Sequence, residues 1–265
     1  MRACPTNCGP MSEAAGNYTE DAFLGGQLHL RQPRSGHRAG HDAMLLAAAT
    51  PARPGDRVVE FGAGIGAAGL ALARRVAAVE LVLVEIDSHL ASMARSNAAA
   101  NGISAEVVVL DVTSAAGDFS SAGLFPDSAD VVLMNPPFND VTRHRASPDR
   151  ARASAHVAGP ALLEGWVTAA RRTLKSGGVL SLIWRADGIT EALAALQRGF
   201  GSVAILPVHA EAAKPAIRVL ICAVKGGKAP TRIHGALLLN DESGLPNKRA
   251  VEILAGKSVL PLAMP

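Results

Sequence analysis

Short runs of consecutive apolar residues alternate along the chain with longer segments in which apolar residues recur at helical spacing. Five such runs predict strands that are buried on both faces, at residues 57–61, 81–86, 106–110, 130–134 and 179–184. The helical segments lie at residues 67–76, 88–101, 162–174 and 191–197. Strands that alternate with helices in this way predict a parallel, doubly wound α/β sheet.

The pattern changes toward the carboxyl end of the chain. Two further apolar runs, at 203–208 and 216–224, are separated only by residues 209–215. This connection is too short for a helical crossover, so the two strands should pair antiparallel. We therefore expect a seven-stranded, mostly parallel sheet with an antiparallel last hairpin.

The segments on either side of this core carry weaker patterns. Propensity and alternation predict short strands at 28–32 and 236–239 and helices at 41–49 and 248–254. The chain is expected to divide into a flexible tail over 1–20, a cap over the substrate and cofactor site at 21–50, a core over 51–228 and an extension over 229–265.

Composition adds two constraints. With 49% hydrophobic residues among 265 the chain can bury a large core, but only 3% are aromatic, so the core must be mostly Ala, Val and Leu. An aromatic residue such as Phe138 is then a candidate for a special role. The net charge of +3 is too small by itself to indicate nucleic acid, and the distribution of charge matters more.

The cysteines and the absence of targeting patterns indicate the cellular compartment in which the protein is expected. Cys4, Cys8 and Cys222 are odd in number and widely spaced, which argues against a disulfide framework and favours a reducing compartment. No second ligand pair follows Cys4 and Cys8, so no metal site is expected. The sequence shows neither a signal-peptide pattern nor an apolar stretch long enough for a bilayer. We expect a soluble, cytoplasmic protein.

A glycine-rich loop follows the strand at 57–61. Gly62, Gly64 and Gly66 lie where open α/β sheets bind ligands, and glycine lets the backbone approach a ligand closely. The spacing fits the dinucleotide fingerprint, and Glu85 ends the next strand where a ribose-binding acid belongs. The loop alone does not separate a nicotinamide enzyme from another enzyme with a nucleoside cofactor.

Acidic residues occur at three successive strand ends. Glu60 can meet a cationic methionine amino group, Glu85 can accept both ribose hydroxyls, and Asp111 can accept from an adenine amine. Each alone also fits a solvated loop acid. Together they favour S-adenosylmethionine as the cofactor.

The fourth strand ends at Asn135-Pro136-Pro137-Phe138. The two prolines stiffen the turn and hold Asn135 extended. The Asn135 side-chain oxygen and the Pro136 carbonyl are then two acceptors that can face one –NH2 group, with Phe138 as a flat apolar face beside them. This arrangement suits a planar molecule with an exocyclic amine, although a plain strand-ending turn capped by Asn135 is the alternative.

Basic residues concentrate in the loop that follows, over residues 139–154. They can form a surface that tracks phosphates, or simply a solvated loop. The cluster comprises Arg143, His144, Arg145, Arg150 and Arg152, joined by Lys214, Arg218, Lys225, Lys228 and Arg232.

Taken together, these motifs resemble the Rossmann-like class I methyltransferases that use S-adenosylmethionine and act on planar nitrogens. Over residues 23–260 the chain is most similar to the bacterial tRNA1(Val) adenine-N6 methyltransferase family. Residues 40–46 are like that family's Gly-Thr-Asp-Ala-Val-Leu-Leu segment, and residues 214–220 also match. Two departures are Phe138, where Tyr is more frequent, and His41, where Thr is usual.

The resemblance implies transfer of a methyl group from S-adenosylmethionine to adenine N6 in tRNA, by Asn135, Pro136 and Phe138, without a metal. It places Asp42 over the methionine end of the cofactor. Phe138 also fits the guanine-N2 methyltransferases of ribosomal RNA, and a protein glutamine-N5 methyltransferase is a further alternative. A nicotinamide-dependent oxidoreductase and a non-catalytic binding module stay open as well. The expected RNA contacts are Pro137, Arg143, Arg145, Arg150, Arg152, Lys214 and Arg218.

Overall fold

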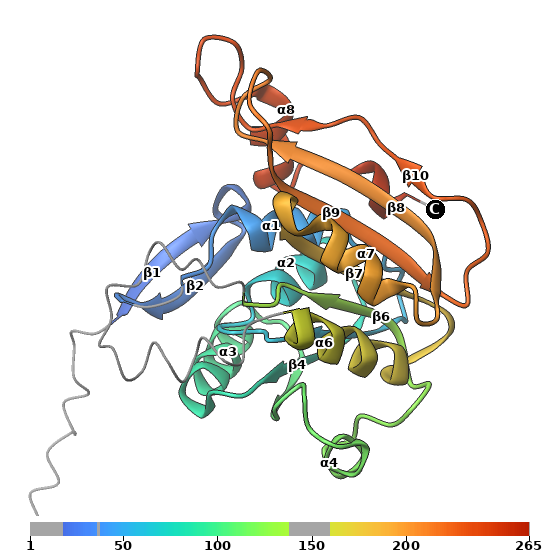
Figure 1. The fold of residues 1–265 in the computed structure, drawn as a ribbon. Coiled ribbons are helices and arrows are strands. Elements are labelled where there is room, and N and C mark those ends of the chain that lie inside the picture. The colour runs from blue at the N-terminus through green and yellow to red at the C-terminus, as the bar shows by residue number, and fades with distance from the viewer. Residues whose placement is uncertain (1–17, 36–37, 138–159, 265) are drawn as a thin grey trace, which may run out of the picture.

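The computed structural model describes residues 18–35, 38–137 and 160–264 (Figure 1). The strands are β1 Tyr18–Phe23, β2 Leu28–Pro33, β3 Arg57–Phe61, β4 Glu80–Glu85, β5 Ala105–Val109, β6 Ala129–Met134, β7 Leu174–Arg185, β8 Phe200–His209, β9 Ala216–Lys225, β10 Arg232–Ile233 and β11 Leu237–Leu238. The α-helices are α1 His41–Ala49, α2 Ala67–Arg75, α3 Ser88–Ala100, α4 Ala116–Ser121, α6 Pro160–Thr173, α7 Ile189–Leu196 and α8 Lys248–Leu254. Short 3-10 helices are η1 Leu24–Gly26, η2 Ala186–Gly188 and η3 Pro261–Ala263.

The central sheet has the strand order β10-β8-β9-β7-β6-β3-β4-β5, and β11 also pairs with β8. Within the described part of this sheet, β9 alone runs antiparallel to its neighbours. The seven predicted strands and the antiparallel last hairpin are confirmed. Among the described residues this sheet has nine strands rather than seven, because the C-terminal extension adds β10 and β11. Strand β11 lies within the strand predicted at 236–239, whereas β10 is too short to show a hydrophobic period.

Helices cover both faces of this sheet, so the central strands β3, β4, β6 and β7 are largely buried on both sides, whereas β5 and β10 are partly exposed. Neighbouring strand residues point to opposite faces, and each face has its own core: Val58 packs with Leu83, whereas Val59 packs with Val84. The first core includes α1, α2 and α3, and the second includes α4, α6 and α7. This arrangement explains why the strands read as continuous apolar runs.

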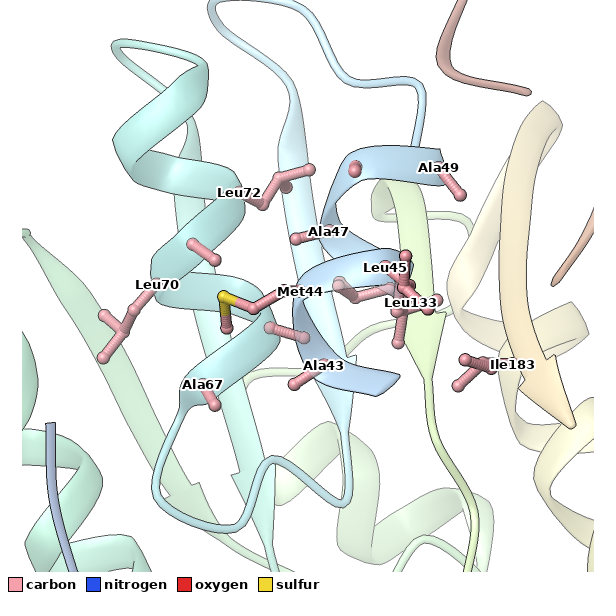
Figure 2. Close-up of a cluster of buried hydrophobic side chains, with 14 of the residues drawn as sticks. Ala43, Met44, Leu45, Ala47, Ala49, Ala67, Leu70, Leu72, Leu133 and Ile183 are labelled. Carbon is pink, nitrogen blue, oxygen red and sulfur yellow. The ribbon is translucent and has the colours of Figure 1, made fainter. Parts of the chain in front are cut away.

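From Ala43 to Ala49, helix α1 is apolar and buried on all sides. Figure 2 shows its side chains between helix α2 and strands β6 and β7, with Met44 on the α2 side and Leu45 beside Leu133. Its other side is covered by the C-terminal extension, since α8 packs against it and the Leu260 N–H donates to the Ala48 carbonyl at 2.9 Å. Helix α1 is thus held by residues from the far end of the chain.

Strands β1 and β2 form a separate antiparallel hairpin beside α3. Strand β1 is not predicted from the sequence, and it begins at Tyr18, so residues 18–20 belong to the hairpin rather than to the tail; residues 1–17 lie outside the described part of the chain. The hairpin edge is held by two side-chain amides, one from Asn97 of α3 and one from Asn101, the C-cap residue of the same helix. Asn101 accepts from the His29 N–H at 3.0 Å and donates to the His29 carbonyl at 2.6 Å, and Asn97 makes the equivalent pair of bonds with Arg31.

The parallel strands bring the predicted site residues to one edge. Because β6, β3, β4 and β5 are adjacent, Asn135, Gly62, Glu85 and Asp111 follow one another along the carboxyl edge of the sheet. Across residues 18–35, 38–137 and 160–264, no helix is long and apolar enough to span a membrane.

Candidate cofactor and substrate site

A cavity of about 290 Å³ lies at this carboxyl edge. The glycine-rich loop with Gly62 and Gly64 lines it, as do Glu60, Asn135 and, from the start of α1, Asp42. Its volume is near the lower end of the roughly 300–1,000 Å³ typical of small-molecule sites. Residues predicted from separate motifs therefore share one cavity.

A larger cavity of about 520 Å³ lies elsewhere. It opens at the amino edge of the sheet, beside Asp56, Asp130 and Lys175, at the opposite ends of the strands. In open α/β sheets ligands bind at the carboxyl edge, so the smaller cavity is the candidate site.

Each glycine of this loop is glycine for a different physical reason. Gly62 has φ +64° and a Cβ there would lie 2.4 Å from Trp166 Cη2, so it must be glycine for packing. Gly64 has φ +56° and a Cβ there would meet nothing within 4 Å, so its backbone is open to the cavity that it lines. Gly66, with φ +85°, is the N-cap of α2; a Cβ there would approach Leu83 at 3.0 Å. Gly66 does not line the cavity, so its contact with the cofactor stays a prediction.

Glu60 is buried, with 4% of its surface exposed, and its Oε2 accepts from the Gly69 N–H at 2.7 Å. A Cβ at Gly69 would lie 2.7 Å from the same oxygen, so the close contact requires glycine there. Burial is the main cause that raises the pKa of Glu60 to about 8; the nearby charge of Glu85 acts in the same direction, and the Gly69 and Ala68 N–H groups oppose the rise. A cation placed beside this carboxyl would favour its ionised form.

Glu85 is also buried and braces the loop. Its Oε2 accepts from the Gly64 N–H at 2.7 Å and its Oε1 from the Asp87 N–H at 2.9 Å. Each carboxylate oxygen keeps a further lone pair for a hydroxyl donor.

Asp111 lies at the next strand end, but its Oδ1 accepts from the Thr113 N–H and hydroxyl at 2.8 and 2.7 Å, and it does not line the cavity. Its contact with adenine therefore stays a prediction.

Asn135 follows β6 and lines the cavity. Its Oδ1 is buried and accepts no hydrogen bond from any described residue. A buried acceptor without a donor costs about 1–3 kcal/mol, so such atoms are uncommon unless a ligand satisfies them. Pro136 is buried and Pro137 is exposed. Phe138 lies outside the described residues, as do Arg143, Arg145, Arg150 and Arg152.

The wall opposite the glycine-rich loop is the segment that leads into α1. Both His41 and Asp42 line the cavity, and the contact of Asp42 with the methionine end of the cofactor stays a prediction. Asp42 forms an ion pair with Arg218 of β9, in which Nε donates to Oδ2 at 2.9 Å.

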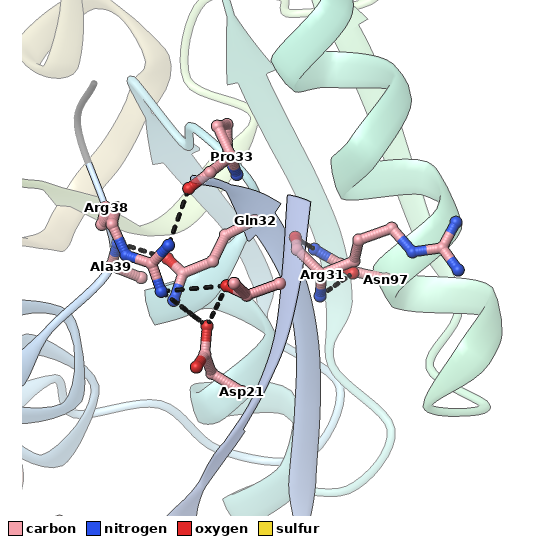
Figure 3. Close-up of polar contacts among 8 residues, drawn as sticks. Asp21, Arg31, Gln32, Pro33, Arg38, Ala39 and Asn97 are labelled. Carbon is pink, nitrogen blue, oxygen red and sulfur yellow. Dashed lines mark hydrogen bonds and ion pairs between the residues drawn. The ribbon is translucent and has the colours of Figure 1, made fainter. Parts of the chain in front are cut away.

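A polar network that the sequence does not reveal positions this wall (Figure 3). Buried Gln32 donates to Asp21 Oδ2 at 2.6 Å and accepts from the Ala39 N–H at 2.9 Å. Arg38, which lines the cavity, donates to the same Asp21 oxygen at 2.8 Å and to the Pro33 carbonyl at 2.8 Å. Hydrogen bonds from Gln32, Thr19 and Arg38, with the charge of Arg38, hold the pKa of Asp21 below its ordinary value. The one signal in the sequence is a Gln at an inward position of the alternating segment 28–32.

The predicted basic surface divides into two groups. Lys214 and Arg218 lie at the carboxyl edge, where they pair with Glu211 and Asp42. Lys225 is at the other end of β9, roughly 23 Å from Arg218 at strand spacing, and pairs with Asp127 at 2.6 Å. Lys228 follows Lys225 in the chain, and Arg232 lines the cavity at the amino edge. These three residues therefore do not extend the predicted basic surface around the candidate site.

The described ranges contain no group of three or more His, Cys, Asp or Glu side chains placed to hold a metal ion. Cys222 is a free buried thiol, and burial raises its pKa to about 11, so it is not a reactive thiolate.

Comparison with known families gives one match over most of the chain. The model of the methyltransferase small domain family matches residues 35–211. The tRNA1(Val) (adenine(37)-N6)-methyltransferase of Porphyromonas gingivalis strain W83 is 31% identical over 180 residues, which cover 64% of this chain and 68% of that protein. The ribosomal RNA small subunit methyltransferase C of Stutzerimonas stutzeri is 35% identical over 107 residues, 39% of this chain. The match spans only 30% of the length of that second relative.

Solved structures agree on the fold. A predicted O-methyltransferase from Agrobacterium tumefaciens has a TM-score of 0.69 and 30% identity, with 83% of this chain and 98% of that chain covered. The 16S rRNA N2 G1207 methyltransferase of Thermus thermophilus, solved with AdoMet and guanosine, has a TM-score of 0.53 and 22% identity, with 78% and 50% covered. The second similarity concerns the fold alone.

Proposed function

The chain belongs to the methyltransferase small domain family and uses S-adenosylmethionine, and from this premise we propose that it methylates an exocyclic amine of an RNA base, with adenine N6 in tRNA as the first candidate. The observation that carries the proposal is the buried Asn135 Oδ1 at the cavity wall, which has no hydrogen-bond donor among the described residues. Family membership also favours S-adenosylmethionine over a nicotinamide cofactor, which the glycine spacing alone left open.

The cavity residues fit this cofactor. Gly64 offers open backbone, and Glu60 and Asp42 offer carboxyl groups for a cationic amino-acid end. Glu85 does not itself line the cavity, but it bonds the Gly64 N–H and keeps lone pairs for hydroxyl donors. S-adenosylmethionine bound here supplies a methyl group on a positively charged sulfur. The protein must then bring an acceptor nitrogen to that methyl group and exclude other nucleophiles.

An aromatic amine is a poor nucleophile because its lone pair is delocalised into the ring. Asn135 Oδ1 and the Pro136 carbonyl can each accept one of the two amine protons, which favours a tetrahedral nitrogen whose lone pair is localised and directed at the methyl group. A hydroxyl has one proton and would leave one acceptor unpaired, so the pair favours –NH2 over –OH. Positioning and fixed dipoles then supply most of the rate.

The target base must leave its stack to reach this edge. A loop nucleotide of tRNA is already partly unstacked and costs less to extrude than a paired one. Such a substrate places the activity in the cytoplasm. Arg143, Arg145, Arg150 and Arg152 follow the Asn-Pro-Pro turn directly and are proposed to contact phosphate.

The test uses methyl-labelled S-adenosylmethionine and total RNA from cells that lack the gene. Transfer RNA and ribosomal RNA are separated after the reaction, digested, and analysed by nucleoside mass spectrometry, with the N135A variant as the control. We expect labelled N6-methyladenosine from tRNA. Absence of label from all RNA, with S-adenosylmethionine binding intact, would overturn the proposal.

Guanine N2 in ribosomal RNA is the second candidate. It is favoured by Phe138, which also fits that class, and by the relatives named ribosomal RNA small subunit methyltransferase C. Labelled N2-methylguanosine from ribosomal RNA would select it. A glutamine side-chain amide offers the same –NH2 donors, and label in protein rather than RNA would point to that third class.

The basic loop is tested separately by salt dependence. Replacing all four arginines by Ala should weaken RNA binding and flatten the plot of log affinity against log salt, by roughly 0.7–0.9 for each phosphate that the protein no longer neutralises. A K225A/K228A variant is the matched control, because these lysines lie near the amino edge. An unchanged slope in the arginine variant would reduce the loop to a solvated surface.

A further inference from the structure

Arg218 and Asp42 are 176 positions apart and join two separate elements at the cavity. Arg218 Nε donates to Asp42 Oδ2 at 2.9 Å, and the two side chains are 26% and 28% exposed. This ion pair connects the first turn of α1 to strand β9. From the sequence Arg218 was expected to contact RNA, but the structure directs its guanidinium to a carboxylate that lines the cofactor cavity.

The strand order indicates which end of the cofactor lies near Asp42. Glu85, the acid suited to ribose, ends β4, and Asn135 follows β6 on the other side of β3. Helix α1 contacts β7 and β9, beyond β6 in the same direction. A cofactor with its adenosine near β4 and its reactive sulfur near Asn135 therefore has its amino-acid end on the side of Asp42.

Arg218 is well placed to fix the Asp42 carboxylate. Its Nη1 also donates to the Ile217 carbonyl at 3.0 Å, which orients the guanidinium relative to the strand. Strand β9 is paired on both sides, with β7 and with β8, so the anchor is rigid. The start of α1 has no such stiffness of its own, because its N-cap is Gly40 and no side chain caps it.

We propose that Arg218 is a positioning residue for the cofactor: it holds the Asp42 carboxylate at the cavity wall, where the carboxylate receives the ammonium of the amino-acid end. The inference rests on S-adenosylmethionine binding in this cavity and is independent of which base is methylated. A planar guanidinium held by two acceptors suits this role better than a flexible ammonium. The pair also keeps Asp42 from turning toward the unsatisfied N–H groups of its own helix.

Comparing the binding of two ligands distinguishes a positioning role of Arg218 from a role in the stability of the fold. S-adenosylhomocysteine carries the amino-acid end, whereas 5′-methylthioadenosine has the adenosine part without it. By calorimetry, we expect R218M to bind S-adenosylhomocysteine roughly tenfold more weakly, the loss of about one charged hydrogen bond. Its affinity for 5′-methylthioadenosine should stay within about twofold of wild type. R218K should recover part of the loss, and D42N/R218M should be no weaker than D42N alone.

The matched control is K225M, which removes a cation from the other end of the same strand and breaks the ion pair with Asp127. It should leave both affinities unchanged. Equal weakening of the two ligands in both R218M and R218K would assign Arg218 a structural role and overturn the proposal, as would unchanged binding of both. If R218M loses RNA methylation but binds both S-adenosylhomocysteine and 5′-methylthioadenosine as wild type does, Arg218 contacts RNA instead.

Discussion

The Asn97 side-chain amide makes two hydrogen bonds with the main chain of Arg31: Oδ1 accepts from its N–H at 2.8 Å, and Nδ2 donates to its carbonyl at 3.0 Å. The same Nδ2 donates to the Ile65 carbonyl at 3.1 Å. One buried side chain of α3 therefore holds both the edge of the β1–β2 hairpin and the glycine-rich loop.

Replacing Asn97 by Ala should lower the free energy of unfolding by about 2 kcal/mol, because buried backbone groups at Arg31 and Ile65 lose their partners. Affinity for S-adenosylmethionine should fall as well, since Ile65 belongs to the loop that lines the cavity. Urea unfolding and calorimetry measure the two effects. N101A is the control: it removes a similar amide pair from His29 at a more exposed position, and should cost about 1 kcal/mol or less without changing cofactor affinity. Equal effects of the two substitutions would contradict the link to the loop.

Asn135→Ala should keep cofactor affinity near that of wild type and lower turnover by about 10²–10³-fold, the scale for one positioned polar group. The physical reason is that the amine would lose one of its two acceptors. Single-turnover kinetics with the RNA substrate measure the effect, and a circular dichroism melt checks the fold. Near-normal turnover would make Asn135 a residue of the turn only.

Glu60 should make both stability and cofactor affinity depend on pH. Its pKa in the folded protein is about 8, above the ordinary value of 4.5, so the folded state binds the proton more tightly than the unfolded state. The stability that this contributes is complete below pH 4.5 and is lost as the pH rises toward 8. A cationic ligand favours the carboxylate, so affinity for S-adenosylmethionine should rise over the same range with release of a proton.

Glu60→Gln removes the titration. Its urea midpoint should fall less than that of wild type between about pH 6 and pH 8, and its weaker cofactor affinity should be flat over this range. Calorimetry in buffers of different ionisation enthalpy counts the protons released. Parallel pH profiles for the two proteins would show that another group is responsible.

Gly62→Ala and Gly64→Ala should fail in different ways, although both glycines have positive φ. At Gly62 the new Cβ meets Trp166 at 2.4 Å, so crowding adds to backbone strain and stability should fall by about 3 kcal/mol. At Gly64 the space is open, so stability should fall by about 1 kcal/mol while cofactor affinity falls strongly. Thermal unfolding and calorimetry distinguish them. Loss of cofactor affinity without loss of stability in G62A would contradict the packing argument.

Most of the sheet could be predicted because its strands are buried on both faces. An apolar run such as 130–134 predicts a buried strand from its own residues alone. The lengths of the connections between strands then indicate which strands are adjacent and whether they run parallel or antiparallel. Strand β11 lies within the predicted strand at 236–239, whereas β10 could not be found in this way, because it pairs through two residues and owes its conformation to β8. Strand β1 was missed for a similar reason, since it alternates weakly and depends on β2.

The candidate site could be predicted where the chemistry follows a strand end. Glu60, Gly64 and Asn135 all line the cavity, because parallel strands bring their carboxyl ends together. Contacts between distant residues could not be predicted: Gln32 bonds Asp21 and Ala39 around the hairpin, and Arg218 meets a carboxylate far away in sequence. No local pattern reports such pairs, since each depends on how separate elements dock.

The enclosure of α1 has a consequence for biosynthesis. The helix is synthesised early, but the residues that cover it, in β7, β9, α8 and η3, leave the ribosome much later. At roughly 5–20 residues per second, translation from residue 49 to residue 264 takes on the order of 10–40 s. During that time seven successive apolar residues, Ala43 to Ala49 without exception, have no native partner from the end of the chain. The wall of the cofactor cavity is thus among the last parts of the molecule to become native, and the nascent chain is expected to need a chaperone while it waits.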